Sequence, residues 1–265
     1  MKIVVCVKIV PNTSDVTYDK ESGSIIRDNL DSIVNPADLT ALEYAVRLKD
    51  AKICEELFVI SMGVMAKSSL LKEAFALGAD RVILLNDSRF AGADTLATVY
   101  TLKTAIEKIG GADIILCGRQ SLDGDTGQVG PGLATAMDMP FITNAERIDG
   151  VKGGYLRAVR VCDYGRSLTE IPLPGLITVI NNSGAVRLPS LMNVLKAKNK
   201  QIEVWNLDDI EADASLCGAK GSPTSMKSVE SADFNVVTEI LAGDVNESAK
   251  ELALRLAALH PGICA

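Results

Sequence analysis

The chain has 265 residues, of which 48% are hydrophobic and 23% charged, and its formal net charge is −7. This length allows one large domain or two small ones, with a hydrophobic core large enough to be stable without disulfides or structural metal ions. The composition excludes a disordered, collagen-like or coiled-coil chain, and the acidic balance argues against a basic surface for nucleic acid.

Cysteine and histidine usage gives no metal site. Six cysteines are scattered without a C-x-x-C pair, and His260 is the one histidine, so a zinc site is not expected. Cys6 and Cys117 lie in aliphatic runs, where buried free thiols are typical. The first residues predict a strand rather than a signal peptide. No apolar stretch approaches the ~20 residues of a membrane span, so we expect a cytoplasmic chain without one.

Continuous apolar runs of strand length recur along the chain, at residues 3–10, 57–62, 82–85, 114–117 and 176–180. Runs that do not alternate with polar residues indicate strands buried on both faces, as in a parallel sheet. Helical patterns separate them. We therefore expect an α/β fold with a doubly wound, mostly parallel sheet.

Three of the helices have recognisable ends. Asp38 is expected to cap the first, the second ends at Gly78, and Asp94 or Thr95 opens the third, which closes at Gly110-Gly111. The apolar face of the third helix is predicted to carry Leu96, Val99, Leu102, Ile106 and Ile109.

The pattern changes after Pro140. Short strands at 141–147, 154–162 and 167–173, with turns at Asp149-Gly150 and Tyr164-Gly165, predict an antiparallel hairpin or meander added to the sheet. Residues 191–200 are basic, and 218–229 are rich in Ser, Gly and Thr, as in a linker.

A last helix is predicted from Asp244, with Glu247 completing a capping box, to His260-Pro261-Gly262. Its residues 252–259 are apolar on nearly every side, and such a helix must be covered. It either folds back on its own domain or docks on another subunit.

The loop that follows strand 114–117 concentrates the candidate binding groups. Glycines at 124, 127 and 130 permit close backbone approach, Ser121 and Thr126 offer hydroxyls, and a helix is predicted over 129–137. Loops at strand carboxyl ends that lead into helix N-termini bind phosphates. Arg119 is expected to pair with a diphosphate or to form a solvated ion pair. A glycine-rich turn without a ligand is the alternative.

Two hydrolytic mechanisms are less well supported. Asp123 and Asp125 offer a carboxylate pair for a metal or for acid–base work, but no third carboxylate or histidine lies in the loop. Aspartates close to a helix start more often cap its N–H groups. The loop lacks the Gly-Lys-Ser/Thr of a P-loop, and the tail histidine gives no support for His-dependent catalysis.

Four stretches carry a resemblance to a known family. They are strand 4–8 ending in Lys8, the helix opening Asn35-Pro36 with Glu43 downstream, the loop 118–130 with its Gly-Arg-Gln and Asp-Gly-Asp-Thr-Gly-Gln-Val-Gly runs, and segment 191–198. In this order they resemble the beta subunit of electron-transferring flavoproteins over most of residues 1–200. The resemblance implies a Rossmann-like, adenine-nucleotide-binding fold.

The resemblance also implies which residues hold the nucleotide, with Thr95 and Thr98 added as contacts to an extra phosphate or the ribitol. The implied cofactor-binding residues are Cys6, Asn35, Pro36, Ala37, Asp38, Met62, Thr95, Thr98, Gly118, Arg119, Gln120, Ser121, Leu122, Asp123, Gly124, Asp125, Thr126, Gly127, Gln128 and Val129. No catalytic or metal-ligating residue is implied.

The run Asp-Gly-Asp-Thr-Gly-Gln-Val-Gly-Pro and the stretch 91–98 resemble the anaerobic, electron-bifurcating branch of the family. In that branch the beta subunit holds an FAD that accepts hydride from NADH. The electrons divide between ferredoxin or flavodoxin and, through the FAD of the alpha subunit, an acyl-CoA-type dehydrogenase. The redox chemistry would belong to the cofactor.

The resemblance further divides the chain into residues 1–190 as the nucleotide domain, 191–235 as recognition loop and linker, and 236–265 as a C-terminal arm. Leu191 would anchor in the dehydrogenase, and the arm's helix would dock on the alpha subunit. Two alternatives stay open: a respiratory-type subunit that binds AMP as a structural group, and an ATP-binding signalling domain without a redox role.

Overall fold

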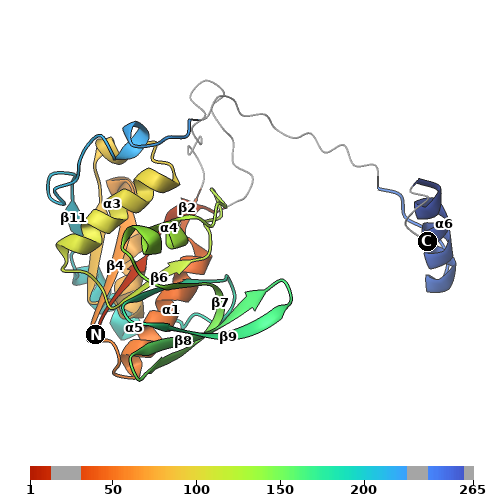
Figure 1. Ribbon diagram of the computed structural model, residues 1–265, viewed down its shortest axis with the longest axis horizontal. Coiled ribbons are helices and arrows are strands. Elements are labelled where there is room, and N and C mark those ends of the chain that lie inside the picture. Colours follow the sequence, from red (N-terminus) through yellow and green to blue (C-terminus); the bar gives the residue numbers. More distant parts are fainter. Residues whose placement is uncertain (13–30, 226–237, 260–265) are drawn as a thin grey trace. The chain divides into compact units, whose positions relative to one another are not determined.

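The computed structural model describes residues 1–12, 31–225 and 238–259. The chain forms two compact units, Met1–Ser228 and Val229–Ala265. In the first unit, helices cover both faces of a central sheet (Figure 1).

Strands and helices alternate along the first unit as the sequence predicts. Its strands are β1 (Lys2–Cys6), β2 (Ile9–Pro11), β3 (Ser32–Val34), β4 (Glu56–Met62), β5 (Arg81–Leu85), β6 (Ile114–Gly118), β7 (Phe141–Lys152), β8 (Tyr155–Cys162), β9 (Gly165–Pro172), β10 (Gly175–Val179) and β11 (Glu203–Trp205). Its helices are α1 (Pro36–Asp50), α2 (Lys72–Leu77), α3 (Thr95–Lys108), α4 (Val129–Ala136) and α5 (Leu191–Asn199), with short 3₁₀ turns at Met65–Leu71, Ser88–Phe90 and Gly218–Lys220.

Within the described residues, the main sheet has nine strands in the order β11-β5-β4-β1-β6-β10-β7-β8-β9. The pairs from β11 to β7 are parallel, and β7-β8 and β8-β9 are antiparallel. The predicted doubly wound sheet with an antiparallel hairpin is therefore confirmed. Because the chain builds outward from β1 to β4 and β5 on one side and from β6 to β10 on the other, the order reverses between β1 and β6, where such folds bind ligands.

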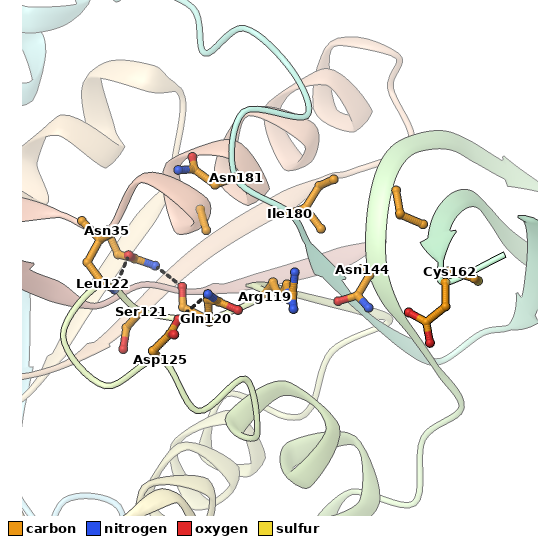
Figure 2. A pocket seen from close by; sticks show the side chains of 13 residues that line it. Asn35, Arg119, Gln120, Ser121, Leu122, Asp125, Asn144, Cys162, Ile180 and Asn181 are labelled. Carbon is orange, nitrogen blue, oxygen red and sulfur yellow. Dashed lines mark hydrogen bonds between the residues drawn. The ribbon is translucent and has the colours of Figure 1, made fainter. Parts of the chain in front are cut away.

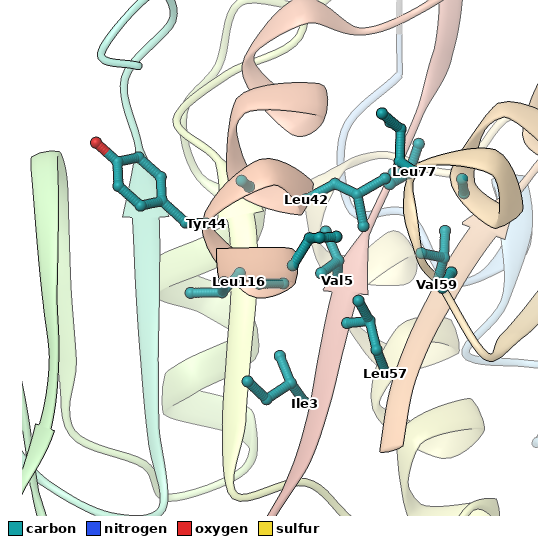
Figure 3. Packing of buried hydrophobic residues seen from close by; sticks show 14 of the residues in the cluster. Ile3, Val5, Leu42, Tyr44, Leu57, Val59, Leu77 and Leu116 are labelled. Carbon is teal, nitrogen blue, oxygen red and sulfur yellow. The ribbon is translucent and has the colours of Figure 1, made fainter. Parts of the chain in front are cut away.

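Alternating residues of the parallel strands fill two cores. Ile3 and Val5 of β1 face the core under α1, α2 and α5, whereas Val4 and Cys6 face the core under α3 and α4. Figure 3 shows the first core, where Leu42 of α1 lies among residues of β1, β4 and β6. Burial of both faces explains the unbroken apolar runs in the sequence.

The predicted strand 3–10 divides into two strands. β1 ends at Cys6, and β2 pairs with β3 in a separate antiparallel ribbon. The break has a local cause: the N–H of Lys8 donates to the carboxylate of Asp38 (2.8 Å) instead of joining the ladder. The prediction of one strand was wrong because a side chain of α1 competes for the backbone.

Asp38 is not the cap of α1. The helix begins at Pro36, directly after Asn35, and proline at the first helical position is pre-organised for a helix start. Asp38 therefore lies inside the first turn, where it is buried. The other predicted helix ends are confirmed, since Gly78 ends α2 and the Asp94 carboxylate caps α3. In α3, Leu96 is 59% exposed rather than part of the buried face.

The hairpin turn lies later than predicted. β7 continues through Asp149-Gly150, where the register shifts, and the chain turns at Gly153-Gly154. Both glycines have positive φ, as a tight two-residue hairpin turn requires. The second turn, predicted at Tyr164-Gly165, lies one residue earlier, at Asp163-Tyr164 between β8 and β9.

The chain after residue 190 still belongs to the first unit. The expected loop 191–198 is the helix α5, which packs on α2, and β11 pairs with β5. Further on, the Thr224 hydroxyl donates to the Asp94 carboxylate (2.8 Å), and Ser222 accepts from the Asp94 N–H (2.8 Å). The compact unit thus extends beyond residue 190.

The second unit contains α6 (Val245–Leu259). Asp244 accepts the N–H groups of Asn246 and Glu247, and the Glu247 carboxylate accepts the N–H of Asp244 (3.2 Å), which confirms the predicted capping box. In this structure α6 has no buried residue among those described. The predicted end at residues 260–262 lies outside the described residues. None of the described helices has the length and apolarity needed to cross a membrane.

Candidate functional site

The loop between β6 and α4 borders a cavity of about 460 Å³ at the carboxyl edge of the sheet (Figure 2). One wall is this loop with the start of α1, and the other comes from β7, the end of β8 and the chain after β10. The lining residues are Asn35, Ala37, Arg119, Gln120, Ser121, Leu122, Asp125, Asn144, Val161, Cys162, Asp163, Ile180 and Asn181.

Asp38 joins the ends of the two strands at which the sheet order reverses. Its carboxylate accepts the N–H of Lys8 after β1 (2.8 Å) and the N–H of Gly118 at the end of β6 (3.0 Å). Burial raises the pKa of this carboxyl to about 7, against the opposing effect of these donors and of Asn35. Because both oxygens are occupied by the backbone, Asp38 shapes the site rather than facing its cavity.

Asn35 and Lys8 hold the first half of the loop. The Asn35 amide donates to the carbonyl of Gln120 (3.0 Å) and accepts the N–H of Leu122 (3.3 Å). The Lys8 ammonium lies 2.6 Å from the carboxylate of Asp123, whose side chain is only 5% exposed. Burial alone would raise the pKa of Asp123, but the hydrogen bond and charge of Lys8 outweigh it and hold that pKa below its ordinary value.

The glycines of the loop differ in how much space surrounds them. A Cβ on Gly118 would lie 2.8 Å from that of Ala37 and closer still to the Asp38 carboxylate. A Cβ on Gly130 would collide with the Thr178 side chain, so this glycine serves packing of α4 on β10 rather than the predicted approach to a ligand. Gly124 has more room: a Cβ there would meet the Ser121 hydroxyl at 3.3 Å.

The structure divides the predicted cofactor-binding residues into two groups. Those that line the cavity are Asn35, Ala37, Arg119, Gln120, Ser121, Leu122 and Asp125. Those outside its lining are Cys6, Pro36, Asp38, Met62, Thr95, Thr98, Gly118, Asp123, Gly124, Thr126, Gly127, Gln128 and Val129. Leu191 lies on α5, away from the cavity.

Several residues of the second group flank the loop from the α3 side of the sheet. Thr95 donates its hydroxyl to the side-chain oxygen of Gln128 (3.1 Å), which connects the start of α3 to the start of α4. Met62 packs against the core under these helices. Cys6 and Cys117 are paired in register and buried, as predicted, and their mutual hydrogen bond together with burial raises the pKa of Cys117.

Sequence reasoning missed the opposite wall of the cavity: Asn144, Val161, Cys162, Asp163, Ile180 and Asn181. One signal was available for two of them. Ile180 and Asn181 follow β10, a parallel strand next to β6, and carboxyl ends of adjacent parallel strands share one edge. Asn144 has a positive φ of 58°, which the sequence does not reveal.

The arrangement is suited to binding rather than to bond cleavage. No group of three potential metal ligands occurs among the described residues. Asp123 is neutralised by Lys8, and Asp125 interacts with Gln120, so the two carboxylates do not form a free pair. Arg119 is exposed beside the cavity and, within the described ranges, makes no ion pair. It is the cation available to a bound anion.

Comparison with known proteins identifies the family. The family model "Electron transfer flavoprotein domain" matches residues 22–210. The chain is 39% identical to the electron transfer flavoprotein subunit beta of Thermoanaerobacterium thermosaccharolyticum, over 98% of this chain and 99% of that protein. It is 37% identical to the caffeyl-CoA reductase-Etf complex subunit CarD of Acetobacterium woodii, over the same shares. It is 39% identical to the protein FixA of Azorhizobium caulinodans, over 86% of this chain and 84% of that protein. With the fold and the loop, these matches show that the chain belongs to the electron transfer flavoprotein family, as a beta subunit.

Proposed function

We propose that this beta subunit binds FAD and works in electron bifurcation. Electrons from NADH would pass to ferredoxin or flavodoxin and, through an alpha subunit, to an acyl-CoA-type dehydrogenase. The observation that carries the proposal is the cavity of about 460 Å³ beside the loop, whose volume falls in the range of cofactor pockets. The bound FAD would supply the redox chemistry, and the protein would hold and orient it.

The residues present fit a flavin dinucleotide. Arg119 offers a guanidinium to a diphosphate, and the N-terminus of α4 follows the loop. Asn144 and Asn181 bring side-chain amides to the far wall, and amides can hydrogen-bond to the edge of a heterocyclic ring. Leu122 and Ile180 add apolar surface.

The proposed partners rest on two exposed apolar surfaces. Leu188, Leu191, Met192 and Leu195, here called the docking stripe, are exposed before and along α5, and we propose that they bind the dehydrogenase. The name of the Acetobacterium relative, a subunit of a caffeyl-CoA reductase-Etf complex, supports a partner that acts on a CoA thioester. The exposed leucines of α6 would bind the alpha subunit.

The decisive experiment identifies the nucleotides that acid releases from the complex with the alpha subunit. Two FAD and no AMP per heterodimer would support the proposal. One FAD and one AMP would show that this subunit binds AMP as a structural group and would remove bifurcation at this site.

A variant assigns the second FAD to this chain. Arg119→Gln should reduce the count from two FAD to one, because it removes the cation beside the cavity. Arg166→Gln is the matched control, since Arg166 is an exposed arginine of the hairpin whose guanidinium pairs with Glu146. Loss of FAD in both variants, or in neither, would contradict the assignment.

Removal of residues 244–265 tests the role of α6. The shortened chain should retain its first unit but fail to form a stable heterodimer on gel filtration. Full-yield assembly without α6 would contradict its role in binding the alpha subunit.

A further inference from the structure

The docking stripe is exposed, but the segment that carries it is held to the first unit by contacts at both ends. Its four side chains are 93%, 76%, 62% and 49% exposed in chain order; Leu191, Met192 and Leu195 lie on α5, and Leu188 precedes that helix. Ser190 accepts the N–H of Asn193 (3.2 Å) and so fixes the start of α5. The orientation of the stripe therefore depends on what holds the two ends of this segment.

The carboxyl end is held by α2 and its flanking loop. Lys72 donates to the carbonyl of Lys198 (2.8 Å), and Lys200 donates to the carbonyl of Ala79 (3.2 Å). Ala197 is buried against the core. These contacts leave the preceding end to be fixed by the chain between β10 and α5.

That preceding chain, residues 183–187, lies along α1. The Arg47 guanidinium donates to the carbonyl of Ala185 (3.0 Å), and the Tyr44 hydroxyl lies 3.1 Å from the carbonyl of Ser183. Arg187 makes the strongest contact, a two-pronged ion pair in which its Nε and Nη2 donate to the Glu43 carboxylate (2.8 and 3.2 Å). A fourth contact runs from the Arg187 Nη1 to Asp50 (2.8 Å).

Glu43 is the centre of this network. Its side chain is 4% exposed, and it also accepts from Arg47 (2.7 Å) and from the backbone N–H of Arg187 (3.2 Å). Burial alone would raise its pKa, but hydrogen bonds from the two arginines outweigh it and hold the pKa below its ordinary value. Removing this charge leaves the Arg187 guanidinium with Asp50 alone and so weakens the attachment of residues 185–187 to α1, which then depends on Asp50 and on the Arg47 contact to Ala185.

The same helix holds the loop of the candidate site. Asn35 precedes the first turn of α1 and binds the backbone of Gln120 and Leu122, while Asp38 in that turn binds Gly118. The Glu43 network lies a little over one turn further along. One rigid helix therefore touches both the nucleotide loop and the support of the docking stripe.

We propose that Glu43 is a positioning residue, which fixes the docking stripe relative to the nucleotide site through Arg187 and Arg47. The inference rests on the proposed function, because it takes the stripe to be the surface that binds the dehydrogenase. Electron transfer between bound proteins requires a defined geometry, so displacement of the stripe weakens productive docking rather than the redox reaction itself.

The experiment uses the complete heterodimer and a short-chain acyl-CoA dehydrogenase as the probe. For Glu43→Gln, the KM for the dehydrogenase should rise about tenfold, kcat at saturating dehydrogenase should stay within about twofold, and the nucleotide content should not change. Hydrogen exchange should accelerate in residues 183–195. The control is Glu170→Gln, which removes an ion pair with Arg157 on the hairpin and should leave both kinetic constants unchanged.

A second variant keeps the test informative if Glu43→Gln folds poorly. Arg187→Gln leaves Glu43 paired with Arg47, and it should raise the same KM. Unchanged KM in a folded variant, or equal loss of kcat and nucleotide, would overturn the inference alone. If the wild-type complex shows no saturable transfer to the dehydrogenase, the proposed function fails first, and the inference falls with it.

Discussion

The two halves of the glycine-rich loop differ in what holds them. Residues 118–123 are tied to other elements: Gly118 to Asp38, the N–H of Arg119 to the carbonyl of Val179 (2.7 Å), and Asp123 to Lys8. Within the described residues, the backbone N–H groups of residues 124–128 donate only inside the loop, as from Gly124 to the Ser121 hydroxyl (3.3 Å) and from Asp125 to the Ser121 carbonyl (3.0 Å). Gly124, Asp125 and Thr126 are exposed.

This difference separates the half of the loop that other elements hold in place from the half that they leave more exposed. The first half is fixed by the folded chain and so presents its cavity-lining side chains in one arrangement. Among the described residues, the second half makes few contacts with other elements, such as that of the Gln128 side chain with Thr95. The same residue type therefore has different surroundings within one motif: Gly118 is tightly packed against α1, whereas Gly124 is exposed. Substitutions in the two halves should therefore have effects of different size and kind.

The largest effect is expected for Gly118→Ala. Its Cβ would overlap the Asp38 carboxylate and press on the Ala37 Cβ and backbone at 2.8 and 2.9 Å. Overpacking of this kind should lower the free energy of unfolding by about 3 kcal/mol, measured by urea denaturation. Gly63→Ala is the control, because a Cβ there meets only Leu84, at 3.9 Å. Equal stability of the two variants would show that the surroundings of Gly118, at the end of β6, are not tightly packed.

Asp38→Ala should be the next most damaging change. It leaves the N–H groups of Lys8 and Gly118 without their acceptor, and a buried donor without a partner is costly. We expect a loss of about 2 kcal/mol in the free energy of unfolding, together with faster hydrogen exchange at both amides. Protection of these amides equal to the wild type would contradict the role of Asp38 as a clamp.

The titration of Asp38 should be visible in the pH dependence of stability. Because its pKa in the folded chain is raised from 3.8 to about 7, the folded state binds the proton more tightly than the unfolded state. The contribution of Asp38 is therefore complete below about pH 4 and falls as the pH rises to about 7. Relative to the non-titrating Asp38→Asn variant, the wild type should lose stability across that interval. Parallel curves would contradict the prediction.

Asp123→Asn should have a smaller effect of opposite pH sense. The pKa of Asp123 is lowered, so its ion pair with Lys8 stabilises the fold at neutral pH and is lost as the pH falls below the ordinary carboxyl range. A pair with one partly exposed partner should contribute about 1 kcal/mol. Lys8→Met should give a similar loss, and the double variant should lose less than the sum. Strict additivity would show that the two charges do not interact.

Gly124→Ala should have the smallest effect on stability, below about 0.5 kcal/mol, because its Cβ would meet only the ends of two side chains, the Ser121 hydroxyl at 3.3 Å and the Lys8 ammonium at 3.8 Å. Under the proposed function it should nevertheless reduce the nucleotide retained after gel filtration, because Gly124 is exposed and directly precedes the cavity-lining Asp125. A stability loss as large as that of Gly118→Ala would remove the distinction between the two halves.

The sequence was sufficient for the parallel sheet, for the added hairpin and for the loop after β6. Uninterrupted apolar runs report burial on both faces, and that property survives without knowledge of tertiary contacts. The end of β1 did not follow from its apolar run, because the deciding group is the carboxylate of Asp38, on α1. The strand character of Asp149-Gly150 was hidden for a similar reason, since a register shift lets β7 continue through a turn-like dipeptide.

The candidate site was predictable where it is continuous in sequence and not where it is assembled by folding. Residues 118–129 form one segment with recognisable phosphate-loop composition. Asn144 and Asp163 carry no local mark, because the hairpin brings them to the cavity from β7 and from the turn after β8. Asp38 was found as a candidate residue, but its part as a backbone clamp depends on two distant N–H groups.

The segment between β10 and β11 has a further consequence. β10 lies beside β6 and β11 lies beyond β5, so this segment leaves the sheet at one place and rejoins it at another, with α5 between. The exposed side chains of such a segment can be substituted with little loss of stability, because the contacts that hold the segment to the sheet and to α1 are made by other residues. On the proposed function, a change of redox partner would need only a few substitutions at these surface positions and would leave the loop after β6 intact.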